Sequence, residues 1–171
     1  MQHALLVPFP DLAPVVGPWL EQSVGSSPSQ GVSPQGVSPH VTVLFPYPPP
    51  DDEVVETTRR VLEDQAAFDV DFREIGRFGD EVVYLVPDPA EPFVAAAVAL
   101  ARQFPDWPPY SGEYAEVTPH LTVAWGSRLA EAEAALRPLL PLHARAREAV
   151  LLSETEPGRW VEHCRFPFRE P

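Results

Sequence analysis

The sequence predicts an α+β fold built from two similar halves, and three observations predict it. First, the chain has 171 residues, of which 44% are hydrophobic, enough for one core of ordinary size. Second, short stretches with the alternation of strands are interspersed with stretches of helical spacing. Third, the order strand, helix, hairpin occurs twice. Residues 1–171 are therefore expected to form a single bilobal domain that arose by internal duplication.

Local sequence signals set the expected elements in order. β-branched and alternating apolar residues favour strands, and near-helical apolar spacing favours helices. Pro8 ends the first strand, Asp51 or Asp52 is a suitable N-cap for the second helix, and Pro138 ends the last helix. The expected elements are strand 3–7, helix 15–21, strand 40–45, helix 51–65, strand 68–72, turn 77–80, strand 81–86, helix 91–104, strand 120–125, helix 129–136, strand 144–152 and strand 159–166.

The segment 24–39 differs from the rest because it consists almost wholly of Gly, Ser, Pro, Gln and Val. It contains the pentapeptide Gln-Gly-Val-Ser-Pro twice in succession, at 30–34 and 35–39. Such a composition cannot bury an apolar face, so we expect a mobile loop over 24–39. The repeat is either a slippage insertion without a role or a flap over a site, since it leads directly to His40.

Charge and cysteine content exclude several classes of protein. The formal net charge is −13, and all twelve basic residues are arginine. We therefore expect no binding of long nucleic acid, although a local pocket can still bind one phosphate. Cys164 is the single cysteine, so there is neither an internal disulfide nor a Cys-rich zinc site. Apolar runs are too short for a membrane span and no signal peptide is evident, so we expect a cytoplasmic protein without membrane contact.

One motif occurs in both halves of the chain. Pro39–Val43 and Pro119–Val123 agree at four of five positions and lie 80 residues apart. On a strand, residues i and i+2 share a face, so each motif presents a histidine and a threonine together. The intervening apolar residues, with Phe45 in the first strand and Trp125 in the second, are expected to face the core. The polar residues concerned are His40, Thr42, His120 and Thr122.

If a pseudo-twofold axis relates the halves, the two polar faces meet across a groove. Two imidazoles and two hydroxyls then surround one small volume, which suits phosphoryl transfer at a phosphodiester. One neutral imidazole accepts a proton from the attacking oxygen, and one imidazolium donates a proton to the leaving oxygen. The hydroxyls donate hydrogen bonds to phosphate oxygens. This scheme needs no metal or other cofactor.

Two other readings of the motif remain open. A histidine at a strand end is often structural, and a duplication copies structural features as readily as functional ones. Two histidines can also bind zinc, but zinc sites usually have three or four protein ligands. Threonine, rather than a further ligand, occupies position i+2 in both motifs.

With these motifs the chain resembles the 2H phosphoesterase superfamily, in particular its 2′-5′ RNA ligase-like and RNA 2′,3′-cyclic phosphodiesterase members. The two His-x-Thr motifs carry the resemblance, which extends over nearly the whole chain. It implies two lobes, each an antiparallel sheet with outer helices, facing across a central cleft. It also implies metal-independent cleavage of cyclic phosphates or 2′-5′ linkages, with His40, Thr42, His120 and Thr122 as the catalytic residues.

The acidic composition narrows the expected substrate. A small phosphoester, a nucleotide or a short RNA end suits this chain better than a long RNA. We expect a monomeric hydrolase, with 2′-5′ ligation or non-catalytic binding of a nucleotide or RNA end as the alternatives. Tyr84 is expected on a strand beside the first motif strand, and Tyr110 lies in an aromatic loop. Both are candidate substrate-binding residues, with packing as the alternative: Tyr84 half-buried with its hydroxyl at the rim, and Tyr110 at the junction of the lobes.

Overall fold

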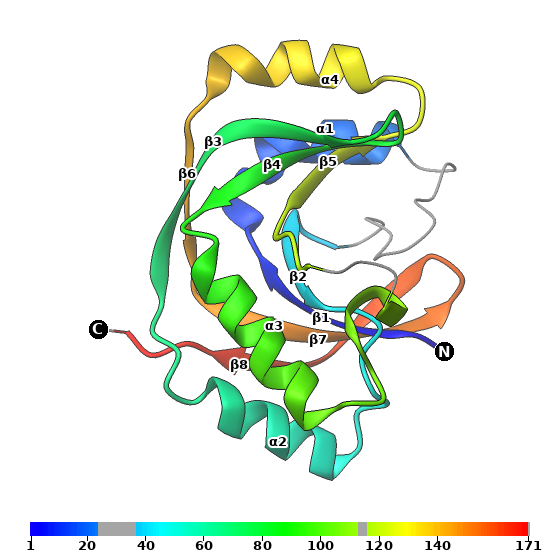
Figure 1. Cartoon of the computed structure of the whole chain (residues 1–171). Helices are drawn as coiled ribbons and strands as arrows, with labels where there is room; N and C mark the ends of the chain where they lie inside the picture. The colour runs from blue at the N-terminus through cyan, green and yellow to red at the C-terminus, as the bar shows by residue number, and fades with distance from the viewer. Residues whose placement is uncertain (24–36, 113–115, 171) are drawn as a thin grey trace.

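The computed structural model describes residues 1–23, 37–112 and 116–170 (Figure 1). It confirms the α+β class, because helices pack on a sheet whose neighbouring strands are antiparallel. The elements are β1 (His3–Pro8), α1 (Ala13–Gln22), β2 (His40–Leu44), α2 (Asp52–Leu62), β3 (Phe68–Phe78), β4 (Val82–Asp88), α3 (Glu91–Gln103), β5 (Leu121–Trp125), α4 (Leu129–Leu136), β6 (Leu142–Ala146), β7 (Glu148–Glu156) and β8 (Arg159–Pro167).

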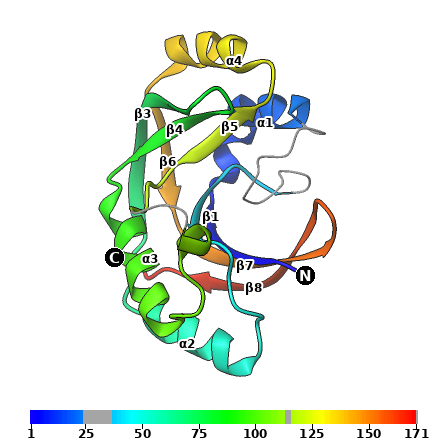
Figure 2. The same ribbon diagram turned by 45° about the vertical axis from the view of Figure 1, so that its right-hand side comes forward.

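The strands form one curled antiparallel sheet rather than a separate sheet in each lobe. Its order is β6-β3-β4-β5-β2-β1-β7-β8, and every neighbouring pair is antiparallel. The expectation of two sheets is wrong because β2 and β5 pair at Val41 and Leu121, which joins the halves. Figures 1 and 2 show the curl, with α1 and α4 near one end of the molecule and α2 and α3 near the other.

The strands of each half of the sheet do not form one continuous stretch of the chain. One half is β2-β1-β7-β8 and the other is β5-β4-β3-β6, so each begins with a motif strand. β3 follows β2 and α2 in sequence but belongs, with its partner β4, to the half that contains β5, and α1 packs against β5 while α3 packs against β2. The two halves of the sheet are therefore interleaved in sequence, which the simple repeat pattern did not predict.

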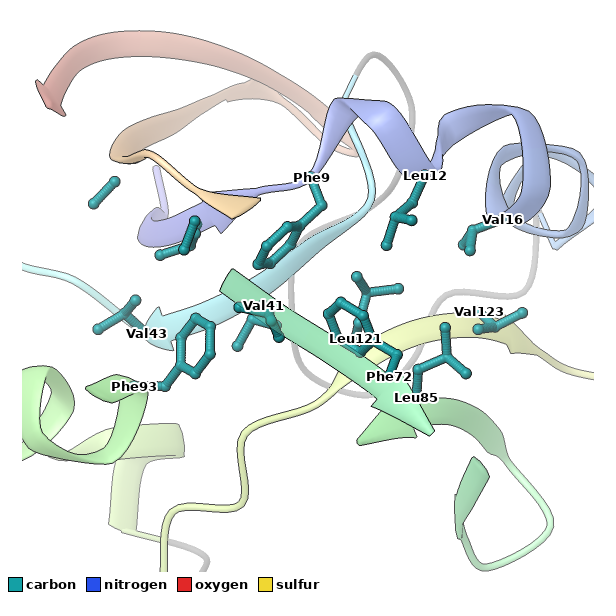
Figure 3. Close-up of a cluster of buried hydrophobic side chains, with 14 of the residues drawn as sticks. Phe9, Leu12, Val16, Val41, Val43, Phe72, Leu85, Phe93, Leu121 and Val123 are labelled. Atoms are coloured by element: carbon teal, nitrogen blue, oxygen red, sulfur yellow. The ribbon is translucent and has the colours of Figure 1, made fainter. Parts of the chain in front are cut away.

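The main core lies on one face of the sheet, where the curl brings distant strands together. Phe9 follows β1 and Phe72 lies on β3, yet their rings contact edge to face at 5.5 Å between centroids. Figure 3 shows Val41 and Leu121 in the same cluster, and both are fully buried. We call this the core face of the sheet, and the opposite face the site face.

A second, smaller apolar cluster lies on the site face of the β1–β7–β8 half. Leu6 and Phe45 belong to it together with Trp160, which lies 6.3 Å from Phe45 between ring centroids. The expectation that Phe45 faces the main core is wrong, because β2 ends at Leu44 and the strand alternation stops there. Trp125 is buried in the main core as expected.

The other predicted helices and strands are present, but several begin or end at different residues. α2 begins after Asp51, whose Oδ1 accepts a 2.8 Å hydrogen bond from the Val54 N–H and so confirms the N-cap. The expected strand 144–152 is two strands, β6 and β7, which end and begin on either side of Arg147. Most of the loop expected over 24–39 lies outside the described residues. No helix in the described ranges has the length and apolarity needed to cross a membrane.

Candidate functional site

The two motif strands meet at the centre of the sheet. Val41 on β2 pairs with Leu121 on β5, and both side chains are buried on the core face. Continuing this antiparallel register by one residue places each motif histidine beside the threonine of the other strand. The opposite face therefore carries four polar side chains, each half-buried: His40, Thr42, His120 and Thr122.

Both imidazoles are held by the same local hydrogen bond. Nδ1 of His40 lies 2.9 Å from the Ser38 carbonyl oxygen, and Nδ1 of His120 lies 2.8 Å from the Thr118 carbonyl oxygen. A carbonyl oxygen only accepts hydrogen bonds, so Nδ1 is the protonated nitrogen in both rings. Nε2 of each ring is then a proton acceptor when the ring is neutral and a donor when it is charged.

The environment of both histidines favours the neutral imidazole. Burial is the main cause that lowers the pKa of His40 to about 4; the Ser38 carbonyl opposes it, and the nearby charge of His120 adds to it. Burial also lowers the pKa of His120, while the Thr118 carbonyl partly opposes this. The influence of one ring on the other agrees with their closeness across β2 and β5. Near neutral pH, both therefore carry an unprotonated Nε2 in the absence of ligand.

In each half of the sheet, a row of paired residues starts at the motif threonine and crosses the neighbouring strands. The two rows occupy matching positions but differ in chemistry. In one half, Leu6 lies opposite both Thr42 and Val150. In the other half, Tyr84 lies opposite Thr122 and Gly76. An aliphatic side chain therefore stands beside the first motif, where a tyrosine stands beside the second.

Tyr84 lies beside the second motif strand, which corrects the expectation that it neighbours the first. Its strand β4 pairs with β5, and its ring contacts the His120 ring at 5.4 Å between centroids. The Tyr84 ring lies across Gly76, where a Cβ atom would stand only 2.4 Å from Cζ of Tyr84. Phe78 stacks on Tyr84 at 4.3 Å and contacts His120 edge to face at 4.8 Å.

Sequence reasoning missed Phe78 and Gly76. It assigned Phe78 to a turn over 77–80, whereas β3 continues to Phe78 and carries the ring to His120. The glycine opposite an aromatic residue on a neighbouring strand was the available signal, but the pairing of β3 with β4 had to be known to use it. Register shifts in β3–β4 and β4–β5 also disturb simple alternation.

Tyr110, the other candidate for substrate contact, packs at the second apolar cluster. Its backbone N–H donates a 2.6 Å hydrogen bond to the Phe45 carbonyl oxygen, and the two rings lie 6.4 Å apart. Tyr110 has a φ of 50°, an unusual conformation for a residue with a side chain. This places Tyr110 in a packing role, and its contact with substrate stays a prediction.

The remaining histidines lie apart from the paired motifs. His3 is buried, and its Nδ1 lies 2.8 Å from Oγ of Ser153. His143 is exposed on β6, with Nδ1 2.6 Å from Oδ1 of Asp71. Cys164 packs against the main core, and burial raises the pKa of its thiol, so it is a poor nucleophile.

No three His, Cys, Asp or Glu side chains gather as a metal site requires within residues 1–23, 37–112 and 116–170. Position i+2 of each motif, where a further metal ligand could stand, is a threonine. Its hydroxyl suits a phosphate oxygen. Chemically, this site has two imidazoles and two hydroxyl groups on one face.

Comparison with known proteins identifies a family and several similar folds. A family model described as the 2′-5′ RNA ligase superfamily matches residues 29–158. No curated protein sequence gives a match. The crystal structure of TT0787 from Thermus thermophilus has a TM-score of 0.65 at 21% identity, covering 99% of each chain.

Two structures of E. coli LigT are also similar. The complex with NADP⁺ has a TM-score of 0.62 at 17% identity, covering 98% of this chain and 97% of LigT. The complex with 3′-AMP has a TM-score of 0.61 at 17% identity, covering 98% and 96%. At such identities the likeness is one of fold.

Proposed function

The chain belongs to the 2′-5′ RNA ligase superfamily, and on that premise we propose that it is a metal-independent phosphodiesterase that hydrolyses a 2′,3′-cyclic phosphate. The substrate is a nucleotide or a short RNA end. Its catalytic residues are the two motif histidines, and the two motif threonines bind the phosphate. The superfamily supports a phosphoesterase, and the site itself supports the finer assignment.

The observation that carries the proposal is the matched pair of hydrogen bonds between Nδ1 and a backbone carbonyl. Because His40 and His120 each donate from Nδ1, each ring directs its Nε2 away from its own backbone. Their strands pair at Val41 and Leu121, which places both rings on the same face of the sheet. Two identically held imidazoles on adjacent strands match what a general acid and a general base require.

The reaction balances with these groups alone. Water attacks phosphorus, and Nε2 of the neutral imidazole accepts the proton that water loses. The bond from phosphorus to one ribose oxygen breaks, and Nε2–H of the imidazolium donates a proton to that oxygen. The product is a phosphomonoester with a free ribose hydroxyl. Thr42 and Thr122 donate hydrogen bonds to the non-bridging oxygens, where charge develops.

Binding of the anionic substrate favours the protonated imidazole that is scarce in the ligand-free site. Burial disfavours the imidazolium of both His40 and His120, so the acid form is scarce before substrate binds. A phosphodiester anion between the rings favours a charged imidazole. Protonation of one histidine is thereby coupled to substrate binding.

Charge and ligand comparisons support a small substrate. The net charge of −13 disfavours a long polyanion. Many arginines are engaged by carboxylates, as Arg77 is by Glu133 and Arg128 by Glu131. The structures of LigT complexed with NADP⁺, 3′-AMP and ATP show nucleotides bound to a protein of this fold.

The test is turnover of 2′,3′-cyclic mononucleotides by the purified protein, with product followed by phosphorus NMR. We expect His40→Ala and His120→Ala each to lower kcat by about 10²–10⁴-fold. His143→Ala, which changes an exposed histidine on β6, is the matched control and should retain full activity.

Two outcomes would contradict the proposal. Binding of 3′-AMP without turnover of any cyclic substrate would indicate a non-catalytic binding module. Joining of a 2′,3′-cyclic end to a 5′-hydroxyl, in excess of hydrolysis, would indicate a ligase.

A further inference from the structure

We propose that Phe78 and Tyr84 are positioning residues for His120, because their stacked rings fix the orientation of its imidazole and shield that ring from bulk water. We call these two residues the aromatic pair. The inference rests on the proposed function, in which His120 exchanges a proton, and adds the side chains that hold this histidine for that step.

The aromatic pair and the imidazole form one compact group of three rings. Phe78 and Tyr84 stack with centroids 4.3 Å apart and planes inclined by 29°. The His120 ring lies 4.8 Å from Phe78 and 5.4 Å from Tyr84, at interplanar angles of 85° and 61°. The hydrogen bond from Nδ1 to the Thr118 carbonyl fixes one point of the imidazole and leaves the ring free to turn about it. The contacts with the aromatic pair remove that freedom.

Packing of the apolar clusters does not account for the aromatic pair. Neither Phe78 nor Tyr84 belongs to the main core or to the second apolar cluster. Phe78 is 39% exposed, so its ring contacts lie with Tyr84 and His120 rather than with the core. Tyr84 can occupy its place because Gly76 has no side chain, and a Cβ atom there would stand 2.4 Å from Cζ of Tyr84. The local sequence of β3 therefore leaves room for a ring beside the second motif.

The first motif has different surroundings at the matching position. Leu6 lies opposite Thr42, whereas Tyr84 lies opposite Thr122. Leu6 is buried in the second apolar cluster, while Tyr84 contacts an imidazole. The two motif histidines share the same backbone hydrogen bond but are therefore held by different neighbours.

Shielding by the aromatic pair has a consequence for the charge of His120. Burial is the main cause that lowers the pKa of His120, and the Thr118 carbonyl opposes it. The two rings supply part of that burial because both contact the imidazole. Removing one ring should therefore admit water and raise the pKa of His120 toward the ordinary value of a histidine.

Charged and titratable groups around His120 act on it as well, and they stay in place when a ring is removed. They lie on each element that surrounds the imidazole. Arg77, next to Phe78 in sequence, is paired with Glu133 on α4. The others are His40 on β2, Tyr84 on β4, Glu74 on the same face of β3 as Gly76, and Glu116 two residues before Thr118. A change of one ring thus isolates the effect of shielding.

The test is an NMR titration of the ligand-free protein that follows the imidazole signal of His120, assigned by its absence in His120→Ala. We expect Phe78→Ala to raise the pKa of His120, and Phe78→Leu, which keeps apolar cover, to raise it less. Gly76→Ala displaces the other ring of the aromatic pair and should raise it too, so the test does not depend on one variant folding. Val161→Ala, at an exposed apolar residue of β8, is the control and should leave it unchanged.

The same variants are then compared on 2′,3′-cyclic AMP. In Phe78→Ala the pH of maximal kcat/KM should move toward neutrality, and the maximum should fall by about 10- to 100-fold because the imidazole is no longer held in one orientation. In Phe78→Leu both changes should be smaller. Loss of a merely structural residue would lower the rate by the same factor at every pH.

Two results would overturn the positioning role. One is a titration of His120 that is the same in Phe78→Ala and Gly76→Ala as in the unchanged protein. The other is a loss of activity in Phe78→Ala without a shift of the pH maximum. If the unchanged protein cleaves no cyclic phosphate, the proposed function fails, and the role of the aromatic pair is judged by the ligand-free titration alone, which needs no substrate.

Discussion

The pH dependence of catalysis follows directly from the environment of the two histidines. One must be neutral and the other charged in the same molecule, so activity should pass through a maximum. Two free imidazoles of ordinary pKa would put that maximum close to neutrality, as the sequence alone suggests. In this site burial lowers the pKa of both His40 and His120. The maximum of kcat/KM is therefore expected on the acid side of about pH 6.5.

The size of the effect can be worked out for His40. With a pKa of about 4, roughly one molecule in 300 carries a protonated His40 at pH 6.5. The two apparent values belong to the pair, but both should fall below about 6.5 in the ligand-free protein. At pH 8, kcat/KM should then lie at least about 30-fold below its maximum. Because a bound phosphodiester anion favours imidazolium, the alkaline limb of kcat should lie at higher pH than that of kcat/KM.

Initial rates on 2′,3′-cyclic AMP at constant ionic strength, from about pH 4 to about pH 8.5, give both profiles. The reasoning is refuted if the alkaline limb of kcat/KM lies above about pH 7, or if kcat and kcat/KM share the same limbs. Circular dichroism at each pH separates loss of activity from loss of fold.

Three further predictions concern other parts of the structure. Gly76→Ala should displace the Tyr84 ring and lower kcat/KM by about 10-fold or more, since its Cβ would stand 2.4 Å from Cζ, whereas Gly17→Ala, with nothing within 4 Å, should leave activity intact. Activity should survive an excess of EDTA, because both proton transfers are assigned to imidazoles, and its loss with release of stoichiometric metal would contradict that. Asp51→Ala removes the N-cap bond to Val54 and should lower the free energy of unfolding by about 1 kcal/mol, measured by urea denaturation, with kcat unchanged.

Much of the fold could be predicted because local signals determine most elements. The N-cap at Asp51, the β-branched run at 40–44 and the apolar alternation of 82–86 each act within a few residues. The single sheet could not be predicted in this way. It depends on the pairing of Val41 with Leu121, a contact between strands far apart in the chain, and no local pattern encodes it.

The proposed catalytic residues were easier to find than their surroundings. His40 and His120 were identified because the same short motif occurs twice on predicted strands. The neighbouring rings of Tyr84 and Phe78 were not, since their contacts with His120 depend on the pairing of β3 with β4 and of β4 with β5. The strand alternation also failed at Phe45, immediately after β2 ends. Such misses occur where strands end or shift register.

The most direct test of the acid–base pair uses a nucleoside cyclic phosphate whose leaving ribose oxygen is replaced by sulfur. A thiolate leaves without needing a proton, because its pKa lies near about 8.5. On this substrate, replacing the general acid should cost little, while replacing the general base should still cost about 10²–10⁴-fold. We therefore predict that one of His40→Ala and His120→Ala is rescued by the sulfur substrate and the other is not. Equal, undiminished losses for both variants would contradict the account and would mean that both imidazoles only bind the phosphate.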